Sequence, residues 1–168
     1  CLSQLQDGKL LVSIGRFRPG KLAFFEPNNE IFTPILFRDS INMNSIGIRN
    51  IGISGDSVAW MATTDGMLKY NLKIQRFKLY TRNEGLPYSS IASVHLDKKN
   101  NVWIACENYI LKYNTVLDSF THFDISNEMK DFYSFSYARG KDDKILLGGA
   151  AGLYAFHPDD IRLDMTRP

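Results

Sequence analysis

Side chains capable of acid–base or metal chemistry are few in this chain, and they are dispersed along it. The three histidines, His95, His122 and His157, have no Cys, Asp or Glu at metal-ligand spacing. No serine or cysteine is accompanied by a base in the pattern of a nucleophilic triad. The sequence therefore predicts no catalytic residue, no metal site and no cofactor.

Two further features resemble chemical motifs only superficially. The segment Gly148–Gly152 is rich in glycine, but it lacks the spacing of a phosphate-binding loop and no helix follows it. It is better interpreted as a tight strand connection. Asp97, Asp142 and Asp143 occur in polar segments between apolar runs, where aspartate forms turns. We expect these carboxylates to be structural.

A second kind of chemistry, the recognition of hydroxyl groups, has more candidates. Aromatic rings can stack on the faces of sugar rings, and carboxylates and amides can bond to hydroxyls. Side chains of these types occur in the predicted connections of one face, and we predict them as ligand-binding residues: Asp65, Glu84, Tyr88, Glu107, Asn108, Tyr109 and Tyr133. Alternatively, Tyr88 and Tyr133 only fill the mouth of the fold. For an acidic glycan, the basic group nearest to this set is Arg16, Arg18 and Arg38.

The elements that would position these residues repeat along the chain. Trp60, Tyr70 and Phe77 recur as Trp103, Tyr113 and Phe120, and every offset is 43 residues without a gap. A period of this size is typical of a repeat architecture. The scaffold is then the repeat, and we expect function to lie in its connecting loops.

A third copy follows and a looser one precedes these two. Leu146, Tyr154 and Phe156 continue the pattern towards the C-terminus, and Leu10–Ile14 with Lys21–Phe25 follows it near the N-terminus. Each copy contains short apolar runs broken by Gly, Asn and Asp, which indicates strands and turns. We predict one all-β domain over residues 1–168, with about four four-stranded antiparallel β-propeller blades at residues 1–37, 38–82, 83–125 and 126–168. An unrelated β-sandwich is the alternative.

Composition excludes several classes of protein. The 168 residues carry a net charge of +2 from 20 basic and 18 acidic side chains, which gives no reason to expect nucleic-acid binding. No apolar run approaches the roughly 20 residues that span a bilayer, so we expect no membrane contact by this segment. Cys106 is expected to pack as a small apolar side chain, whereas Cys1 is either the place where the piece begins or a lipid attachment site.

Several motifs in order resemble a known family. Gly85–Ile91 resembles the phrase G-L-P-x-x-x-I that opens a two-component-regulator propeller repeat, and Asn101–Ala105 resembles its tryptophan strand. Asp65–Asn71 is similar to the phrase x-G-L-x-R-Y-D, and Ile145–Pro158 to the phrase of a last blade. These repeats belong to the periplasmic sensor regions of Bacteroidetes hybrid two-component histidine kinases. The chain departs from the family at Ala105 and Cys106, where Gly-Thr is usual, and at Tyr109, where the repeat expects Gly.

The resemblance implies a function and a location. It implies a non-catalytic, extracytoplasmic ligand-sensing segment of an inner-membrane sensor kinase, located in the periplasm and responding to oligosaccharides, with the kinase domain outside this chain. A protein-interaction scaffold and a propeller lyase or glycosidase are the alternatives.

The resemblance also implies an incomplete ring. The parent propeller is expected to have seven blades, so that these four form a partial arc; a self-contained four-blade ring is the alternative. An arc would expose strand edges and blade faces. We therefore expect the partners to be the rest of the parent propeller and, through open blade edges, another copy of the chain.

Overall fold

The chain folds into antiparallel sheets that follow one another in sequence. The computed structural model describes residues 1–14, 21–37, 41, 46–106, 109–124, 132–150 and 152–161, with only the backbone for residues 124 and 132–136. Three sheets have four strands each and the fourth has three among the described residues. We call them blades A to D.

The strands of each blade pair in chain order, so every connection within a blade is a hairpin. Blade A contains β1 (Leu2–Gln4), β2 (Leu10–Ile14), β3 (Lys21–Glu26) and β4 (Ile31–Pro34). Blade B contains β5 (Ile48–Ser54), β6 (Val58–Thr63), β7 (Met67–Asn71) and β8 (Arg76–Tyr80). Blade C contains β9 (Ser93–Leu96), β10 (Val102–Cys106), β11 (Tyr109–Asn114) and β12 (Ser119–Asp124). Blade D contains β13 (Phe132–Arg139), β14 (Ile145–Gly149) and β15 (Gly152–Phe156).

The two tryptophans occupy equivalent positions, as the 43-residue period predicts. Trp60 lies on the second strand of blade B opposite Lys69, and Trp103 lies on the second strand of blade C opposite Lys112. Both indoles are buried. This shared register confirms the prediction of an all-β chain of propeller blades.

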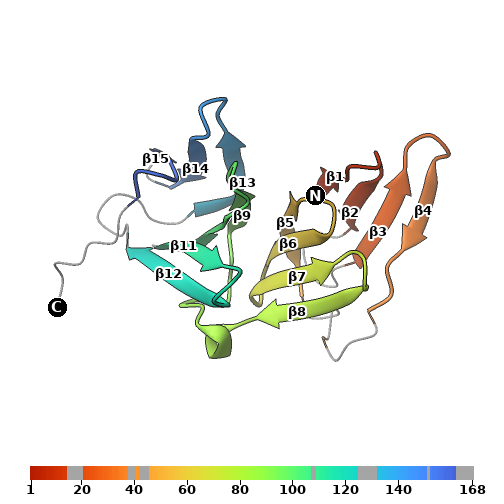
Figure 1. Cartoon of the computed structure of the whole chain (residues 1–168), viewed down its shortest axis with the longest axis horizontal. Helices are drawn as coiled ribbons and strands as arrows, with labels where there is room; N and C mark the ends of the chain where they lie inside the picture. The colour runs from red at the N-terminus through yellow and green to blue at the C-terminus, as the bar shows by residue number, and fades with distance from the viewer. Residues whose placement is uncertain are drawn as a thin grey trace.

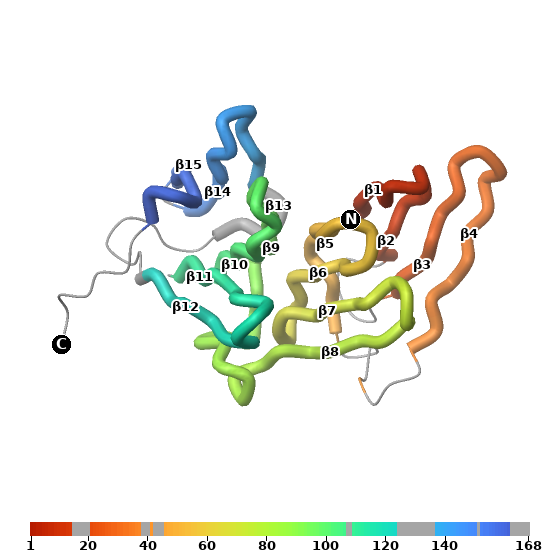
Figure 2. Tube along the Cα trace, in the orientation of Figure 1, coloured from red at the N-terminus to blue at the C-terminus, as the bar shows by residue number. Residues whose placement is uncertain are grey.

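The first strand of each blade forms the inner part of the arrangement. In Figures 1 and 2 the blades follow one another, and β5 contacts β1 on one side and β9 on the other. Asn50 joins two of these inner strands, because its buried amide donates to the carbonyl oxygen of Val94 at 2.9 Å and accepts from the N–H of Val94 at 2.8 Å. This side chain extends the hydrogen bonding of β5 across the blade boundary.

Aromatic side chains fill the blade junctions in the same way each time. The ring of Trp60 lies 6.5 Å from Tyr80 of its own blade and 5.2 Å from Tyr113 of the next blade. Trp103 repeats this arrangement, with ring centroids 5.9 Å from Phe123 and 5.4 Å from Phe156. Burial of large aromatic surfaces at each junction is the main term that holds neighbouring blades together.

The outer faces of the end blades are apolar and uncovered. The ring pair Phe25–Phe32 of blade A, with centroids 4.4 Å apart, corresponds to the pair Tyr70–Phe77 of blade B at 4.1 Å. Tyr70 is buried by the preceding blade, whereas Phe32 is 55% exposed. Leu153 of blade D is likewise 70% exposed. Among the described residues, this is the surface expected of an arc taken from a larger propeller; the number of blades in the parent stays a prediction.

Helical structure is minimal in the described part of the chain. It consists of one 3₁₀ turn, η2 (Arg82–Glu84), in the connection between blades B and C. Within the described ranges no helix has the length and apolar character needed to cross a bilayer. Cys106 is fully buried at the end of β10, as expected for a small apolar side chain.

Candidate functional site

One end of the arrangement carries the connections in which the sequence places its ligand-binding candidates. We call this end the mouth face; it collects the links between second and third strands and the links between blades. Asp65 lies in the turn between β6 and β7, Tyr88 lies in the link from blade B to blade C, and Tyr109 begins β11. The topology therefore brings candidates from three separate segments to the same end.

Tyr88 and Tyr109 form the centre of the site. Their ring centroids lie 5.8 Å apart, and both residues are half-buried at the junction of blades B and C. Tyr109 also lies 6.5 Å from the ring of His122, whose Nε2 is 3.1 Å from the carbonyl oxygen of Gly85. The link that carries Tyr88 is thus held against blade C, which fixes the position of the two tyrosines.

Arg49 contributes a cationic group from the start of the inner strand β5. Its Nη1 donates to Ser90 Oγ at 2.7 Å and to the carbonyl oxygen of Ile91 at 2.9 Å. Burial lowers the pKa of Arg49, and the negative charge of Asp65 acts in the opposite direction. Because guanidinium groups stay protonated in proteins, Arg49 is a permanent donor beside the link that carries Tyr88.

The turn that carries Asp65 depends on a glycine. Gly66 has φ of 146°, and a Cβ there would lie 2.1 Å from the carbonyl oxygen of Tyr80. Only glycine fits this close approach of β7 to the end of β8. Thr63 Oγ1 donates to the Gly66 carbonyl at 2.7 Å, and Thr64 Oγ1 donates to Asp65 Oδ2 at 3.1 Å. The carboxylate of Asp65 is therefore held in place by the local backbone and by Thr64.

Glu84 lies in the same link but serves a local role. Its Oε2 accepts hydrogen bonds from the backbone N–H of Thr81 at 2.7 Å and from Thr81 Oγ1 at 2.8 Å, which forms a capping box on η2. These two hydrogen bonds lower the pKa of Glu84. A ligand would have to compete with the cap for this carboxylate.

Several predicted residues cannot be placed. Glu107 and Asn108 lie outside the described residues, and the side chain of Tyr133 lies outside them as well. The basic group proposed for an acidic glycan, Arg16, Arg18 and Arg38, is also outside the described part of the chain. Their involvement in ligand binding stays a prediction.

Sequence reasoning missed Arg49, Ser90 and His122 as neighbours of the site. The sequence did contain a signal for Arg49. Arg49 carries a charge in the segment Ile46–Ile53, whose other residues are isoleucines, glycines and Asn50. A charge at the start of an inner strand is costly unless it reaches polar partners. Ser90 and His122 carried no comparable signal, since their roles depend on how two blades meet.

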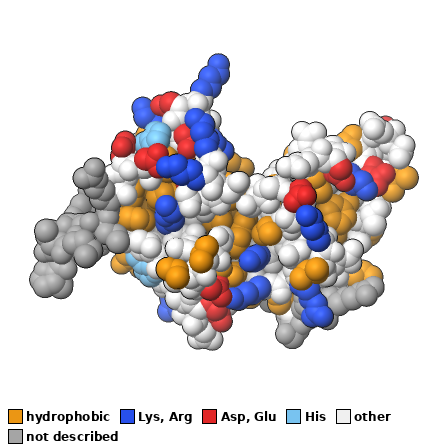
Figure 3. Space-filling view, in the orientation of Figure 1, with side chains coloured by type: hydrophobic (Ala, Val, Ile, Leu, Met, Phe, Trp, Pro, Cys, Tyr) orange, Lys and Arg blue, Asp and Glu red, His pale blue; other side chains and the backbone are white. Residues whose placement is uncertain are grey.

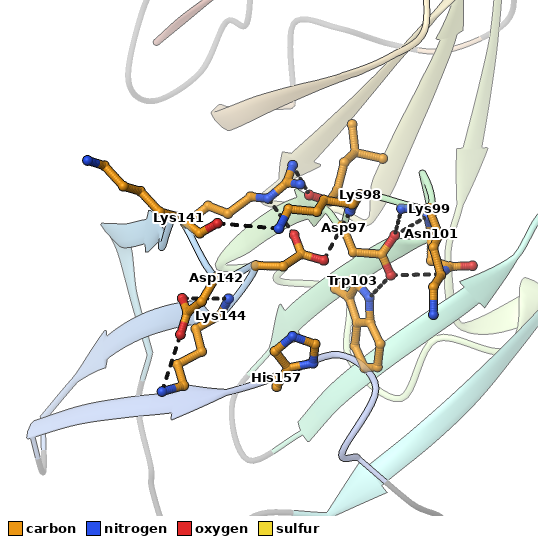
Figure 4. Close-up of polar contacts among 12 residues, drawn as sticks. Asp97, Lys98, Lys99, Asn101, Trp103, Lys141, Asp142, Lys144 and His157 are labelled. Atoms are coloured by element: carbon orange, nitrogen blue, oxygen red, sulfur yellow. Dashed lines mark hydrogen bonds and ion pairs between the residues drawn. The ribbon is translucent and has the colours of Figure 1, made fainter.

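The aspartates at the opposite end form turns, as predicted. Asp97 is buried and accepts from Trp103 Nε1 at 2.9 Å, from Asn101 Nδ2 at 2.7 Å and from the Lys99 N–H at 2.9 Å (Figure 4). Burial acts to raise the pKa of Asp97, but the hydrogen bonds from Trp103 and Asn101 outweigh it and the pKa is lowered. Its oxygens are thus occupied by structural contacts.

Asp143 has a related role between blades C and D. Its Oδ1 accepts from Arg139 Nε at 2.7 Å, and Arg139 Nη1 donates to the carbonyl oxygen of Leu96 at 3.1 Å. No cluster of three or more His, Cys, Asp or Glu suited to a metal ion occurs among the described residues.

Comparison with known proteins identifies related sequences and folds. No protein-family model matches the chain. Histidine kinase P4 of Formosa agariphila is 31% identical over 96 residues, which are 54% of this chain and 7% of that protein. The extracellular domain of the putative hybrid two component system BT3049 of B. thetaiotaomicron is 25% identical, with a TM-score of 0.75, over 94% of this chain and 21% of that one.

A second extracellular domain shows the same fold. That of the putative hybrid two component system BT4673 of B. thetaiotaomicron has a TM-score of 0.68 at 16% identity, over 92% of this chain and 20% of that one. The chain thus spans about a fifth of the length of these domains and less than a tenth of the kinase. The similarities confirm the resemblance to sensor regions of hybrid two-component systems, and they match this chain to extracellular domains.

Proposed function

We propose that this chain is a periplasmic part of the sensor region of a hybrid two-component histidine kinase, and that it binds an oligosaccharide on its mouth face. The observation that carries the proposal is the likeness to the extracellular domain of BT3049, which extends over 94% of the chain. In this reading the chain contributes ligand binding. The membrane anchor and the kinase and phosphorelay domains belong to other parts of the parent protein.

The chemistry of the mouth face supports a hydroxyl-rich ligand. Tyr88 and Tyr109 present adjacent, half-buried rings that can pack against the apolar face of a sugar. Asp65 can accept hydrogen bonds from hydroxyls, and Arg49 can donate them. Opposite charges on these two side chains favour a neutral saccharide over a strongly acidic one.

Isothermal titration calorimetry with a panel of neutral and acidic oligosaccharides tests the proposal. We expect a neutral oligosaccharide to bind, and Tyr109→Leu to weaken binding by about tenfold, since a lost ring contact of about 1.4 kcal/mol corresponds to that factor. Tyr154→Leu on β15 is the matched control, because it also removes a half-buried tyrosine ring but lies in blade D.

Two outcomes would contradict the proposal. If no member of the panel binds the folded chain, the proposal that it binds an oligosaccharide is wrong. If an oligosaccharide binds and Tyr109→Leu weakens binding no more than Tyr154→Leu, then the ligand lies elsewhere than the mouth face.

A further inference from the structure

A groove lies between blades A and B at the end opposite the mouth face. Its volume is about 510 Å³, within the range of about 300–1,000 Å³ that is usual for small-molecule pockets. Its lining comes from the turns β1–β2, β5–β6 and β7–β8 and from the strand β3. Both blades have their four strands, so the groove does not result from a missing blade. Figure 3 shows apolar side chains between these two blades, flanked by acidic and basic ones. We call it the turn groove.

The turn groove occurs where blade A departs from the repeat. In blade B, Lys69 pairs across the strands with Trp60, and its Nζ lies over the indole at 5.0 Å. The same lysine and tryptophan recur in blade C. In blade A the equivalent cross-strand pair is Phe24 with Leu11, of which Leu11 is fully buried and Phe24 is half-buried. A partly exposed aromatic ring therefore stands in the groove where a lysine covers the junction in the other blades.

The apolar part of the lining is held by backbone hydrogen bonds. Leu5, Phe24 and Leu72 supply it, and all three are half-buried. The N–H of Leu5 donates to the carbonyl oxygen of Lys9 at 2.8 Å, and the N–H of Leu72 donates to that of Ser57 at 2.8 Å. These contacts fix the two turns that carry Leu5 and Leu72. A site whose walls are already ordered loses less conformational entropy when it binds a ligand.

The charged part of the lining is balanced within the chain. Its acids and bases are Asp7, Asp56, Lys9 and Lys73. Lys73 pairs with Asp56 at 3.1 Å, and Lys9 pairs with Glu26 at 2.8 Å. Because neither sign of charge is in excess among the described lining residues, an ionic ligand would gain little Coulomb energy here. A neutral ligand can use the same groups, since carboxylates accept hydrogen bonds from hydroxyls and ammonium groups donate them.

A second hollow adjoins the turn groove and shares Asp7 and Lys9 with it. Its volume is about 340 Å³, and its lining includes the amide side chains of Gln4, Asn28 and Asn29. An amide both donates and accepts hydrogen bonds, so this part of the surface also suits hydroxyl groups. The two adjoining hollows together offer room for a ligand of more than one ring.

The lining favours a saccharide over a peptide. Extended peptides commonly bind by adding a strand to a free sheet edge. The described lining of the turn groove consists of turn residues and of Phe24 on β3, a strand that is paired on both sides with β2 and β4. A sugar ring instead needs an apolar surface for its C–H face and hydrogen-bonding groups around its rim. The apolar side chains of the groove supply the first, and its charged and amide side chains supply the second.

We propose that the turn groove and the adjoining hollow form a second binding site, for a neutral oligosaccharide, at the end opposite the mouth face. One sugar ring packs on Phe24, and the saccharide continues towards the amides of Asn28 and Asn29. The site shares no residue with the mouth face, so it goes beyond the function proposed above and either site can exist without the other. Because its walls come from two blades, a bound ligand also holds blades A and B together.

Titration of the folded chain followed by amide NMR separates the two sites. The probes are neutral tetrasaccharides of glucose, mannose, galactose or xylose, with a uronic-acid tetrasaccharide and tetra-alanine for comparison. We expect a neutral probe to shift the signals of Gly8 and Leu72, in the turns at the groove, in a saturable way. The two comparison probes should leave these signals unchanged. The signals of Thr64 and Tyr88 report binding at the mouth face independently.

Variants of the groove test which side chains carry the binding. We expect Phe24→Leu to weaken it about tenfold, because the ring contact is lost. Phe32→Leu is the matched control, because it removes a ring of the same blade whose side chain lies on the other face of the sheet. Gln6→Ala changes an exposed side chain of the groove and should weaken binding about threefold without affecting the fold. It keeps the test open if Phe24→Leu fails to fold.

Several results would overturn the proposal. It is wrong if no neutral probe shifts the signals at the groove, or if the uronic-acid probe or tetra-alanine shifts them as strongly. It is also wrong if neither Phe24→Leu nor Gln6→Ala weakens binding more than Phe32→Leu does. Shifts at Thr64 and Tyr88 alone would support the mouth-face site and overturn this one, whereas shifts at Gly8 and Leu72 alone would do the reverse.

Discussion

The hydroxyl groups of Tyr80 and Tyr113 lie 2.6 Å apart, although the two residues belong to different blades. Tyr113 donates to Asp118 Oδ1 at 2.5 Å, and the single hydroxyl proton of Tyr80 is shared between the Tyr113 oxygen and Asp118 Oδ1, which lies 3.0 Å away. Lys78 Nζ lies 2.7 Å from Asp118 Oδ2. Hydrogen bonds from Lys78 and then Tyr113 lower the pKa of Asp118 to about 2. The junction of blades B and C is thus closed by an ionised carboxylate that two buried phenols solvate.

Tyr113→Phe should destabilise the fold by about 1–2 kcal/mol, because it removes one hydrogen bond to the carboxylate of Asp118 and one to Tyr80. The ring itself should be retained, since Phe156 occupies the equivalent position in blade D. Chemical denaturation of the variant measures the change. Tyr70→Phe is the control: Gln75 stands there in place of Asp118, and we expect a smaller effect. Equal losses in both variants would count against the role of Asp118.

His95 should make stability depend on pH. It is buried, and its Nε2 lies 2.7 Å from Ser93 Oγ. Its ring meets that of Tyr137 edge to face, with centroids 4.7 Å apart, and Arg139 lines the same cavity. Burial lowers the pKa of His95 to about 4. The unfolded chain takes up a proton near pH 6.5, whereas the folded chain does so only near pH 4. The free energy of unfolding should therefore fall by up to about 3 kcal/mol as the pH decreases through this window.

The matched variant isolates this effect from other titrating groups. His95→Gln keeps a polar side chain near Ser93 but does not titrate. We expect the wild-type curve of unfolding free energy against pH to fall more steeply than the variant's between pH 6.5 and pH 4. Parallel curves would mean that folding does not lower the pKa of His95, so that the folded and unfolded chains take up its proton at the same pH.

Asp97→Ala should destabilise blade C by at least about 2 kcal/mol, because it leaves the buried indole N–H of Trp103 and the turn amides without their acceptor. The expected readouts are a lower midpoint in denaturant and a shift in tryptophan fluorescence. Asp142→Ala, in the exposed turn of blade D, is the control and should change stability much less. Similar losses for both would contradict the assignment.

Ser54→Asp should stabilise blade B by about 1 kcal/mol. Ser54 is the repeat equivalent of Asp97. Among the residues that the structure describes, the buried Nε1 of Trp60 has no hydrogen-bond partner, whereas that of Trp103 bonds to Asp97. The new carboxylate would supply the missing acceptor. The gain should disappear in a Trp60→Phe background, which a double-mutant cycle measures. A gain that survives this replacement would have another cause.

Much of the fold could be predicted because the residue spacing that indicates it lies within single blades. The spacing of Trp60, Tyr70 and Phe77 reflects positions within one sheet, and strand pairing between adjacent segments follows from chain order. The turn roles of Asp97 and Gly66 were also within reach, since a short turn is built from its own residues. The candidate site was predicted less completely, because Tyr88 and Tyr109 belong to one face by topology but meet only where two blades pack.

The amino-acid sequence by itself determined the repeat, the strand-and-turn unit and the end of the propeller at which the aromatic and polar loop residues gather. Only the tertiary structure decided which of them touch. Arg49 reaches Ser90 over 41 residues, and Tyr80 reaches Asp118 over 38. The groove beside Phe24 likewise exists only between two blades. The physical reason is that hydrophobic periodicity specifies the face on which a side chain lies, whereas contacts between blades depend on how two complete sheets pack against each other.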